Sequence, residues 1–203
     1  MEQVGARERI VEQADRLFYE KGFDHTSFAH IATAAGLSRG NFYYHFRTKD
    51  EILDAVIDLR TTRTLALLQQ WEAELENPRD RIIRFLAILT DNGSKIMKHG
   101  CPAGTLCLEL AKLGHPSAPG ATAILSLFSQ WLEHQFSTLG ARESAGPLAN
   151  HVLMRSQGIA TLAAAFQETA FVEAELADAA RWINGQIDTF RKQTGDSACS
   201  SSS

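Results

Sequence analysis

Apolar residues recur along most of this chain at the three- and four-residue spacing of helices that bury one face. Asn77 and Pro78 mark a clear helix start, because asparagine caps a first turn and proline fits the first helical position. No alternating pattern typical of strands is found, so the sequence predicts an all-α fold. The predicted helices cover residues 7–21, 48–75, 78–98, 101–113, 121–139, 147–169 and 172–192.

A shorter helical pattern over residues 26–50 is interrupted in its middle. Thr26 or Ser27 can cap a first helix, and Gly36 can take the left-handed conformation that ends it. Ser38 can then cap a second short helix. Two short helices joined by a tight turn with glycine are typical of a helix-turn-helix, whose second helix enters the major groove of DNA. The sequence therefore predicts a DNA-binding domain.

The second short helix carries side chains suited to DNA. Arg39 and Asn41 are residue types that bind base edges or phosphates, and Gly40 lets a helix backbone come close. No acidic residue occurs between Ser38 and Lys49, whereas the whole chain has a net charge of −4. We expect this local basic surface to bind DNA with a clear salt dependence, because each neutralised phosphate releases counterions.

The stretch TSFAHIATAAGLSRGNFYYHFRTK, from Thr26 to Lys49, resembles the DNA-binding signature of the TetR family of bacterial repressors. The resemblance is strong over residues 1–60 and is one of architecture alone beyond them. It implies a homodimer that binds a near-palindromic operator in double-stranded DNA and is released by a small-molecule effector. It also implies a set of DNA-binding residues, on the phosphate backbone or along the groove: Thr26, Ser27, Ser38, Arg39, Gly40, Asn41, Tyr43, Tyr44, His45 and Lys49.

The composition is that of an ordinary globular protein, with 44% apolar and 22% charged residues in a chain of 203. No apolar run approaches the roughly 18 residues of a membrane span, and the first residues are too charged for a signal peptide. Three cysteines without a disulfide-like pattern suit a reducing compartment. We expect a cytoplasmic protein with no membrane partner.

The order of the predicted elements indicates two domains. Residues 1–50 are expected to form the DNA-binding domain, and a helix over residues 48–75 to lead out of it. Residues 51–194 are expected to form a helical domain for effector binding and dimerisation, because DNA binding alone does not need so long a segment. The polar, low-complexity residues 195–203 are expected to be a disordered tail.

The last two predicted helices are joined by so few residues that they are expected to form an antiparallel pair. Apolar residues of the final helix alternate at spacings of four and three, which is typical of the seam of a helix pair or a four-helix bundle. The dimer interface is therefore expected at Val152, Leu162, Phe166, Leu176, Ala180, Ile183, Ile187 and Phe190.

An apolar cavity among the middle helices is expected to hold the effector, an apolar small molecule. Aromatic and sulfur-containing side chains of this region are candidates for its lining, although plain core packing is the alternative for each of them. The candidates are Trp71, Phe85, Met97, Cys101, Cys107, Phe128 and Trp131.

A second interpretation concerns the segment GCPAGTLCLEL. Cys101 lies beside a predicted helix start, where the helix dipole favours a thiolate that oxidants and electrophiles attack. A similar GCPxG segment occurs in some TetR-family members, including relatives of cysteine-based electrophile sensors. Alternatively, Cys101 and Cys107 are small buried apolar residues, and their spacing does not place them on one face of a regular helix.

Other function classes have less support in the sequence. A cysteine-nucleophile enzyme would need histidine and carboxylate partners at a readable spacing, and none is found. The seven histidines are scattered without the spacing of metal ligands, so no metal and no cofactor is expected. The hypothesis that the helix-turn-helix serves only protein contacts does not readily explain why its second helix carries arginine and no acidic residue. Activation instead of repression stays open, because the position of the operator relative to the promoter decides it.

Overall fold

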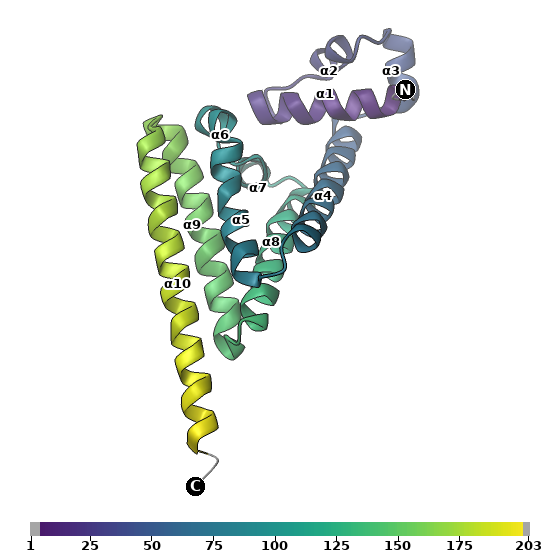
Figure 1. Cartoon of the computed structure of the whole chain (residues 1–203). Helices are drawn as coiled ribbons and strands as arrows, with labels where there is room; N and C mark the ends of the chain where they lie inside the picture. The colour runs from purple at the N-terminus through teal and green to yellow at the C-terminus, as the bar shows by residue number, and fades with distance from the viewer. Residues whose placement is uncertain (1–4, 201–203) are drawn as a thin grey trace. The chain divides into compact units, whose positions relative to one another are not determined.

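The computed structural model describes residues 5–200, with side chains described for residues 5–190, and it is built of helices (Figure 1). No strand occurs in this described part, which confirms the predicted all-α class. None of its helices is both long and apolar enough to cross a lipid bilayer. The helices are α1 (Ala6–Lys21), α2 (Phe28–Ala35), α3 (Arg39–His45), α4 (Lys49–Glu74), α5 (Pro78–Asp91), α6 (Gly93–His99), α7 (Pro102–Leu113), α8 (Ala118–Thr138), the short 3-10 helix η1 (Arg142–Ser144), α9 (Ala145–Phe166) and α10 (Thr169–Ser200).

Internal contacts divide the chain into two compact units. Unit 1 combines the described residues up to Leu65 with Pro102–Leu125, and therefore contains α1 to α3, most of α4, α7 and the start of α8. Unit 2 combines Ala66–Cys101 with the described residues from Ser126 onward. The expected boundary after residue 50 falls inside unit 1, so a separate domain of residues 1–50 stays a prediction.

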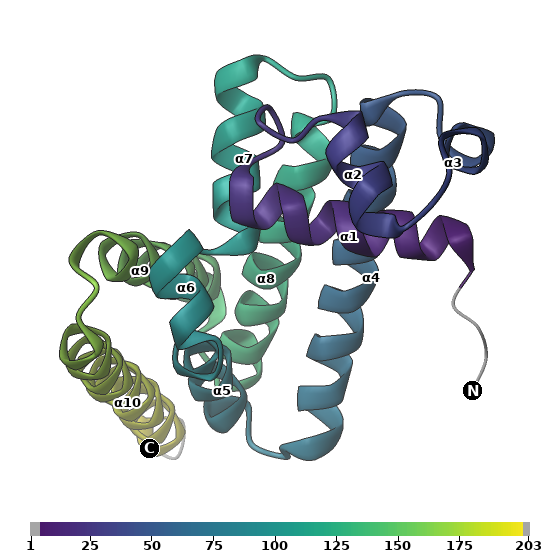
Figure 2. The same ribbon diagram turned by 90° about the horizontal axis from the view of Figure 1, so that it is seen from above.

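Unit 1 is built on the apolar stripe of α1. Ile10, Ala14 and Leu17 recur at helical spacing on this helix and are buried. α1 contacts α2, α3 and α7, and Figure 2 shows α1 beside α2 and α7. Gly22 ends α1 with a φ of 86°, a conformation that favours glycine. The helix-turn-helix of α2 and α3 thus packs against α1.

Unit 2 has a core of its own between long helices. Its largest buried side chains include Trp71, Phe136 and Ile183. α9 and α10 run antiparallel and side by side (Figures 1 and 2), as their short connection predicts. Gln167 ends α9 in the left-handed conformation, with a φ of 58°. α5 and α6 pack against this helix pair.

Two stretches differ from the prediction. The helix expected over residues 78–98 is two helices, because α5 ends at Asp91 and α6 begins at Gly93. Asparagine and glycine both have low helix propensity, and Asn92 accordingly leaves the helical conformation with a φ of −107°. α10 continues to Ser200, beyond the end expected at residue 192, while the expected disorder of residues 195–203 stays a prediction. Residues 201–203 of that predicted tail lie outside the described residues.

Candidate nucleic-acid interface and ligand pocket

The two helices of the helix-turn-helix are each fixed by a serine cap. Ser27 Oγ accepts a hydrogen bond from the backbone N–H of His30 (3.1 Å), and His30 Nδ1 accepts one from the backbone N–H of Ser27 (3.2 Å). Gly36 ends α2 in the left-handed conformation, with a φ of 65°. Ser38 Oγ accepts from the backbone N–H of Asn41 (3.4 Å) at the start of α3. Caps and turn together fix the direction of α3.

One face of α3 is buried and the other is exposed. Phe42 is completely buried, and its ring meets the Phe28 ring edge to face, with 4.6 Å between centroids. Tyr43 is 45% exposed. The centroid of its ring lies 5.1 Å from that of the Phe28 ring and 5.7 Å from Arg39 Cζ. Tyr44 is 84% exposed, which is unusual for a large aromatic side chain. The outer face of α3 therefore presents one supported and one projecting tyrosine beside an arginine.

Gly40 and Arg39 belong to α3, and Arg47 follows this helix by two residues. A Cβ atom added at Gly40 would meet no atom within 4 Å, so internal packing does not require glycine there. Close approach of an outside partner would require it. Arg39 and Arg47 are exposed, and neither guanidinium forms an ion pair with a described residue. Positive charge that is not neutralised internally is available to phosphates.

Two residues expected at the DNA backbone have partners inside unit 1. Thr26 is completely buried, and its Oγ1 donates to the Gly22 carbonyl oxygen at 2.7 Å. A buried hydroxyl does not reach a phosphate, so Thr26 belongs to the turn between α1 and α2. Lys49 Nζ donates to the Phe23 carbonyl oxygen at 2.9 Å and lies 4.0 Å from the centroid of the Phe23 ring. Its expected contact with DNA stays a prediction.

α7 supports the same turn within unit 1. Its one acidic residue, Glu109, accepts hydrogen bonds from the backbone N–H groups of Phe23 (2.9 Å) and Asp24 (2.9 Å). The His115 ring, just after α7, packs on the Phe23 ring at 5.1 Å, and its Nε2 lies 3.5 Å from a carboxylate oxygen of Asp50. These residues are not among those expected from the sequence. The signal available was one acid in a helix whose other residues are mostly apolar.

Arg60 of α4 joins α1 to the start of α7. Its Nε donates to the Asp15 carboxylate at 2.6 Å, and its Nη1 donates to the Pro102 carbonyl oxygen at 2.6 Å. The Arg60 residue is 9% exposed, so these charge-assisted bonds are shielded from water. The DNA-binding helices and α7 are therefore parts of one packed unit.

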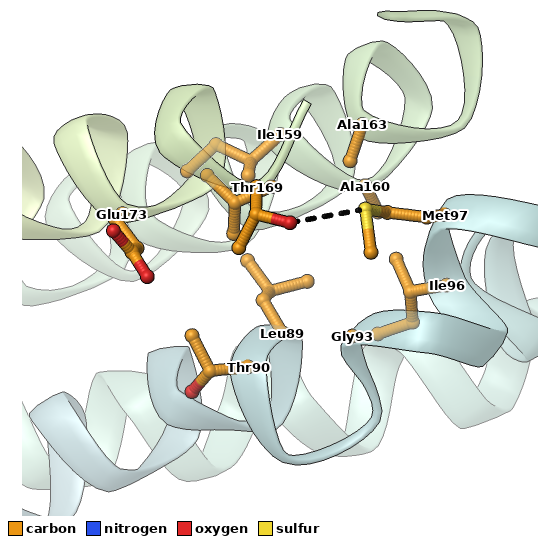
Figure 3. Close-up of a pocket in the computed structure, with 11 residues that line it drawn as sticks. Leu89, Thr90, Gly93, Ile96, Met97, Ile159, Ala160, Ala163, Thr169 and Glu173 are labelled. Carbon is orange, nitrogen blue, oxygen red and sulfur yellow. Dashed lines mark hydrogen bonds between the residues drawn. The ribbon is translucent and has the colours of Figure 1, made fainter. Parts of the chain in front are cut away.

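A pocket of about 200 Å³ lies in unit 2 among α5, α6, α9 and α10 (Figure 3). Its polar lining residues are Thr90, Thr169 and Glu173. The Thr90 hydroxyl donates to the Ala87 carbonyl oxygen (2.8 Å), whereas the Thr169 hydroxyl has a sulfur partner, Met97 Sδ, at 3.9 Å. The apolar wall consists of Leu89, Gly93, Ile96, Met97, Ile159, Ala160, Ala163 and Val172.

Most of the expected lining residues lie elsewhere. Met97 lines this pocket, and Cys101 packs against the apolar cluster around it. Cys107 lies on α7, in unit 1. The four expected aromatic residues instead pack in the core of unit 2, where their rings lie against one another in two pairs. This agrees with core packing, the alternative interpretation. These pairs are Trp71 with Trp131 (5.6 Å) and Phe85 with Phe128 (5.4 Å).

Cys101 lies in the short connection between α6 and α7. Gly100 precedes it with a φ of 76°, and Pro102 is the first residue of α7. Cys101 and Cys107 are partly buried and are not joined by a disulfide. Within the described chain, no group of three or more histidine, cysteine, aspartate or glutamate side chains is placed to hold a metal ion.

An apolar stripe is exposed on α9. Met154, Leu162 and Phe166 are 65%, 41% and 53% exposed and are spaced at multiples of four residues. Of the expected dimer residues, Leu162 and Phe166 belong to this stripe, while Leu176 and Ala180 are half-buried. The others are buried in the core of unit 2 and are not available to a partner: Val152, Ile183, Ile187 and Phe190.

Comparison with known sequences concentrates on the first helices. The family described as bacterial regulatory proteins, tetR family, matches residues 10–56. The chain is 44% identical over 52 residues to the HTH-type transcriptional regulator TtgR of Pseudomonas putida, covering 26% of this chain and 25% of that protein. It is 31% identical over 112 residues to an uncharacterized HTH-type transcriptional regulator in the lacX 3' region of Lactococcus lactis subsp. lactis, covering 53% and 56%. The chain thus spans about half or less of these relatives.

Comparison with solved structures extends over nearly the whole chain. A TetR transcriptional regulator from Legionella pneumophila matches with a TM-score of 0.77 at 26% identity, over 92% of this chain and 100% of that one. The reduced form of NemR from E. coli matches with a TM-score of 0.73 at 18% identity, over 86% and 95%, which shows a shared fold. The likeness in fold therefore includes helices of both units.

Proposed function

Because the chain belongs, through its helix-turn-helix, to the TetR family of bacterial regulatory proteins, we propose that it is a transcriptional repressor. In this proposal two copies bind a near-palindromic operator, and a small molecule bound in unit 2 releases them. One observation carries it: the exposed face of α3 presents basic and aromatic side chains whose charges no described acid neutralises. The matching relatives are regulators, and no catalytic role is assigned.

The residues of α3 divide into two roles. Arg39 offers two parallel donors to guanine and Asn41 a donor and an acceptor to adenine, so both are assigned to base edges. The projecting Tyr44 and the exposed Arg47 are assigned to the phosphate backbone, where a hydroxyl and a cation fit. Specificity is therefore expected from the first turn of α3, and affinity from its last turn and from Arg47 just after it.

The stripe on α9 supports dimerisation. A two-fold axis places the same patch of both copies together, so one apolar stripe per copy is enough for an interface. The dimer would hold two α3 helices at the roughly 34–36 Å separation of successive major grooves. The basic surface of one copy is small, so one copy alone is expected to bind DNA weakly. Two joined copies bind far more tightly, because binding of the first surface holds the second one close to the DNA.

The pocket supports effector control because one of its helices, α6, leads directly into α7 along the chain. Gly93, Ile96 and Met97 of α6 line it, and two residues after α6 the chain enters α7. α7 in turn holds the turn before α2 through Glu109. A ligand that displaces α6 therefore acts on a helix that supports the DNA-binding unit. A coupling of about 1–3 kcal/mol lowers operator affinity roughly 5- to 150-fold.

A binding titration with the DNA upstream of this protein's own gene tests the proposal. We expect a complex of two protomers that survives an excess of unrelated DNA. The double variant Arg39→Ala, Tyr44→Ala is expected to lose it. Arg16→Ala is the matched control, because Arg16 of α1 pairs with Glu20 at 3.1 Å. A complex that unrelated DNA displaces as readily as the upstream DNA contradicts the proposal.

A second candidate is a repressor that is released by modification of Cys101. It is favoured by the position of Cys101 in the connection between α6 and α7 and by its packing against the apolar cluster around the pocket. A group added to the sulfur would displace that connection. After treatment with N-ethylmaleimide, the wild type is expected to release DNA and Cys101→Ser to retain it. Equal release of both proteins excludes this thiol.

A further inference from the structure

The size of the pocket in unit 2 limits its ligand. Pockets for drug-sized molecules hold roughly 300–1,000 Å³, whereas this one holds about 200 Å³. An apolar cavity of roughly 150 Å³ is enough to bind benzene. Its wall includes the buried side chains of Leu89, Ile159 and Val172. A single aromatic ring or a short alkyl chain therefore fits it.

Glu173 is the one charged residue among those described as lining the pocket. Its carboxylate forms no ion pair or hydrogen bond with any described residue, and neither lysine of α6 lines the pocket. Two other acids of α10 are paired: Glu175 accepts from Arg155 at 3.1 Å, and Asp178 binds the same guanidinium, which lowers the pKa of the Asp178 carboxyl. Glu173 is exposed to solvent, and its carboxylate places a negative charge beside an apolar wall.

Thr169 adds a second acceptor. Its hydroxyl donates to Met97 Sδ at 3.9 Å, so the lone pairs of the hydroxyl oxygen are available to accept a hydrogen bond from a ligand. In Figure 3 Thr169 lies between Glu173 and Met97. A ligand ammonium can donate to the carboxylate and the hydroxyl oxygen together. A ligand carboxylate would instead meet the charge of Glu173.

We propose that this pocket binds a small primary ammonium ion with one apolar group, such as an arylalkylamine, whose head lies at Glu173 and Thr169. The inference rests on the proposed function, because it names the effector class of the proposed repressor. Its physical basis is the match between one carboxylate, one hydroxyl acceptor and an apolar space large enough for one ring.

Three probes of matched shape test the charge preference: 2-phenylethylamine, 2-phenylethanol and phenylacetate. Calorimetric titration of the full chain is expected to show the amine binding about two- to fivefold more tightly than the alcohol, with phenylacetate weakest, because exposed ion pairs contribute roughly 0.2–1 kcal/mol. Glu173→Gln should remove the advantage of the amine over the alcohol. Glu168→Gln is the control, because this exposed acid makes the same charge change and does not line the pocket.

A filled pocket tests the location. Gly93 lines the pocket, a Cβ there would meet no atom within 4 Å, and its φ is not positive, so Gly93→Leu should occupy the space without backbone strain. We expect it to lose binding of all three probes while keeping its helical circular dichroism. Unchanged amine binding in Gly93→Leu or in Glu173→Gln, or no amine binding by the wild type, overturns the proposal. Amine binding that these variants remove but that leaves the DNA titration unchanged supports the ligand class and contradicts the effector role.

Discussion

Glu109 of α7 accepts a hydrogen bond from the backbone N–H of Phe23 at 2.9 Å, although 86 positions separate the two residues. The same carboxylate accepts from the backbone N–H of Asp24. A Cβ on Gly22 would lie 2.9 Å from Glu109 Oε1, so the backbone of this turn leaves room for the carboxylate and little more. The turn that leads into the helix-turn-helix therefore depends on a side chain far away in the sequence.

Glu109→Gln should loosen this turn. The amide keeps the size of the side chain but removes its charge and turns one acceptor into a donor that faces an N–H group. Hydrogen bonds to charged groups contribute about 1.5–3 kcal/mol, so we expect the free energy of unfolding to fall by about 1–3 kcal/mol. Hydrogen exchange at the Phe23 and Asp24 amides should accelerate. Lys112→Gln on the exposed side of α7 is the control, and equal denaturation midpoints for Glu109→Gln and the control would contradict the assignment.

Arg47 and Lys49 should respond differently to salt. The Arg47 guanidinium has no ion-pair partner among the described residues, whereas Lys49 Nζ is bonded to the Phe23 carbonyl oxygen. Removing one phosphate contact lowers the slope of log affinity against log salt concentration by about 0.9. Arg47→Gln is expected to show this loss, while Lys49→Gln should mainly lower the free energy of unfolding. A comparable loss of slope in Lys49→Gln would assign its amine to a phosphate, as the sequence predicts.

Gly36 and Gly40 form a matched pair of glycines with opposite roles. Gly36 has a φ of 65°, so Gly36→Ala should destabilise the fold by about 1 kcal/mol through backbone strain. Gly40 lies in the helical conformation with open space around it, so Gly40→Ala should leave thermal stability unchanged or slightly raised. Its DNA affinity should nevertheless fall, because a methyl group would separate the helix from the groove. Full affinity in Gly40→Ala contradicts the close approach.

Leu162→Glu should weaken the dimer. It places a charge in the exposed stripe of α9, where burial against a second copy would leave the carboxylate without a partner. Sedimentation equilibrium is expected to show a dimer for the wild type and a shift of at least tenfold toward monomer for this variant. Ser137→Glu, at an exposed position of α8, is the control. If the wild type is a monomer, or if both variants associate equally, the dimer does not form through α9.

The parts of this fold that the sequence predicts are those determined locally. Ser27, Gly36 and Ser38 each act on residues within one helical turn, so cap and break residues identify α2 and α3 directly. The short connection at Gln167 likewise restricts α9 and α10 to an antiparallel pair. Helix periodicity needs no knowledge of the partner helix, which is why the all-α class could be derived.

The candidate site could be predicted only in part, because it depends on contacts between distant segments. Periodicity shows that Trp71 and Met97 face inward, but it does not separate a filled core from a pocket. Thr26 and Lys49 carry groups that suit phosphates, and only the folded turn shows their internal partners. Glu109 acts across 86 positions, a separation that no local pattern encodes.

We infer that α3 reads base pairs, and the role of Arg39 at its start is tested by measuring binding to DNA one base pair at a time. Fluorescence anisotropy would measure the affinity of the wild type and of Arg39→Ala for the operator and for a set of single base-pair changes. We expect Arg39→Ala to lose about 1–3 kcal/mol of discrimination between base pairs at one position of each half-site and to keep it elsewhere. Arg16→Ala should match the wild type throughout. If Arg39→Ala retains wild-type discrimination at every position, Arg39 does not read a base, which contradicts the role of α3 as the base-reading helix.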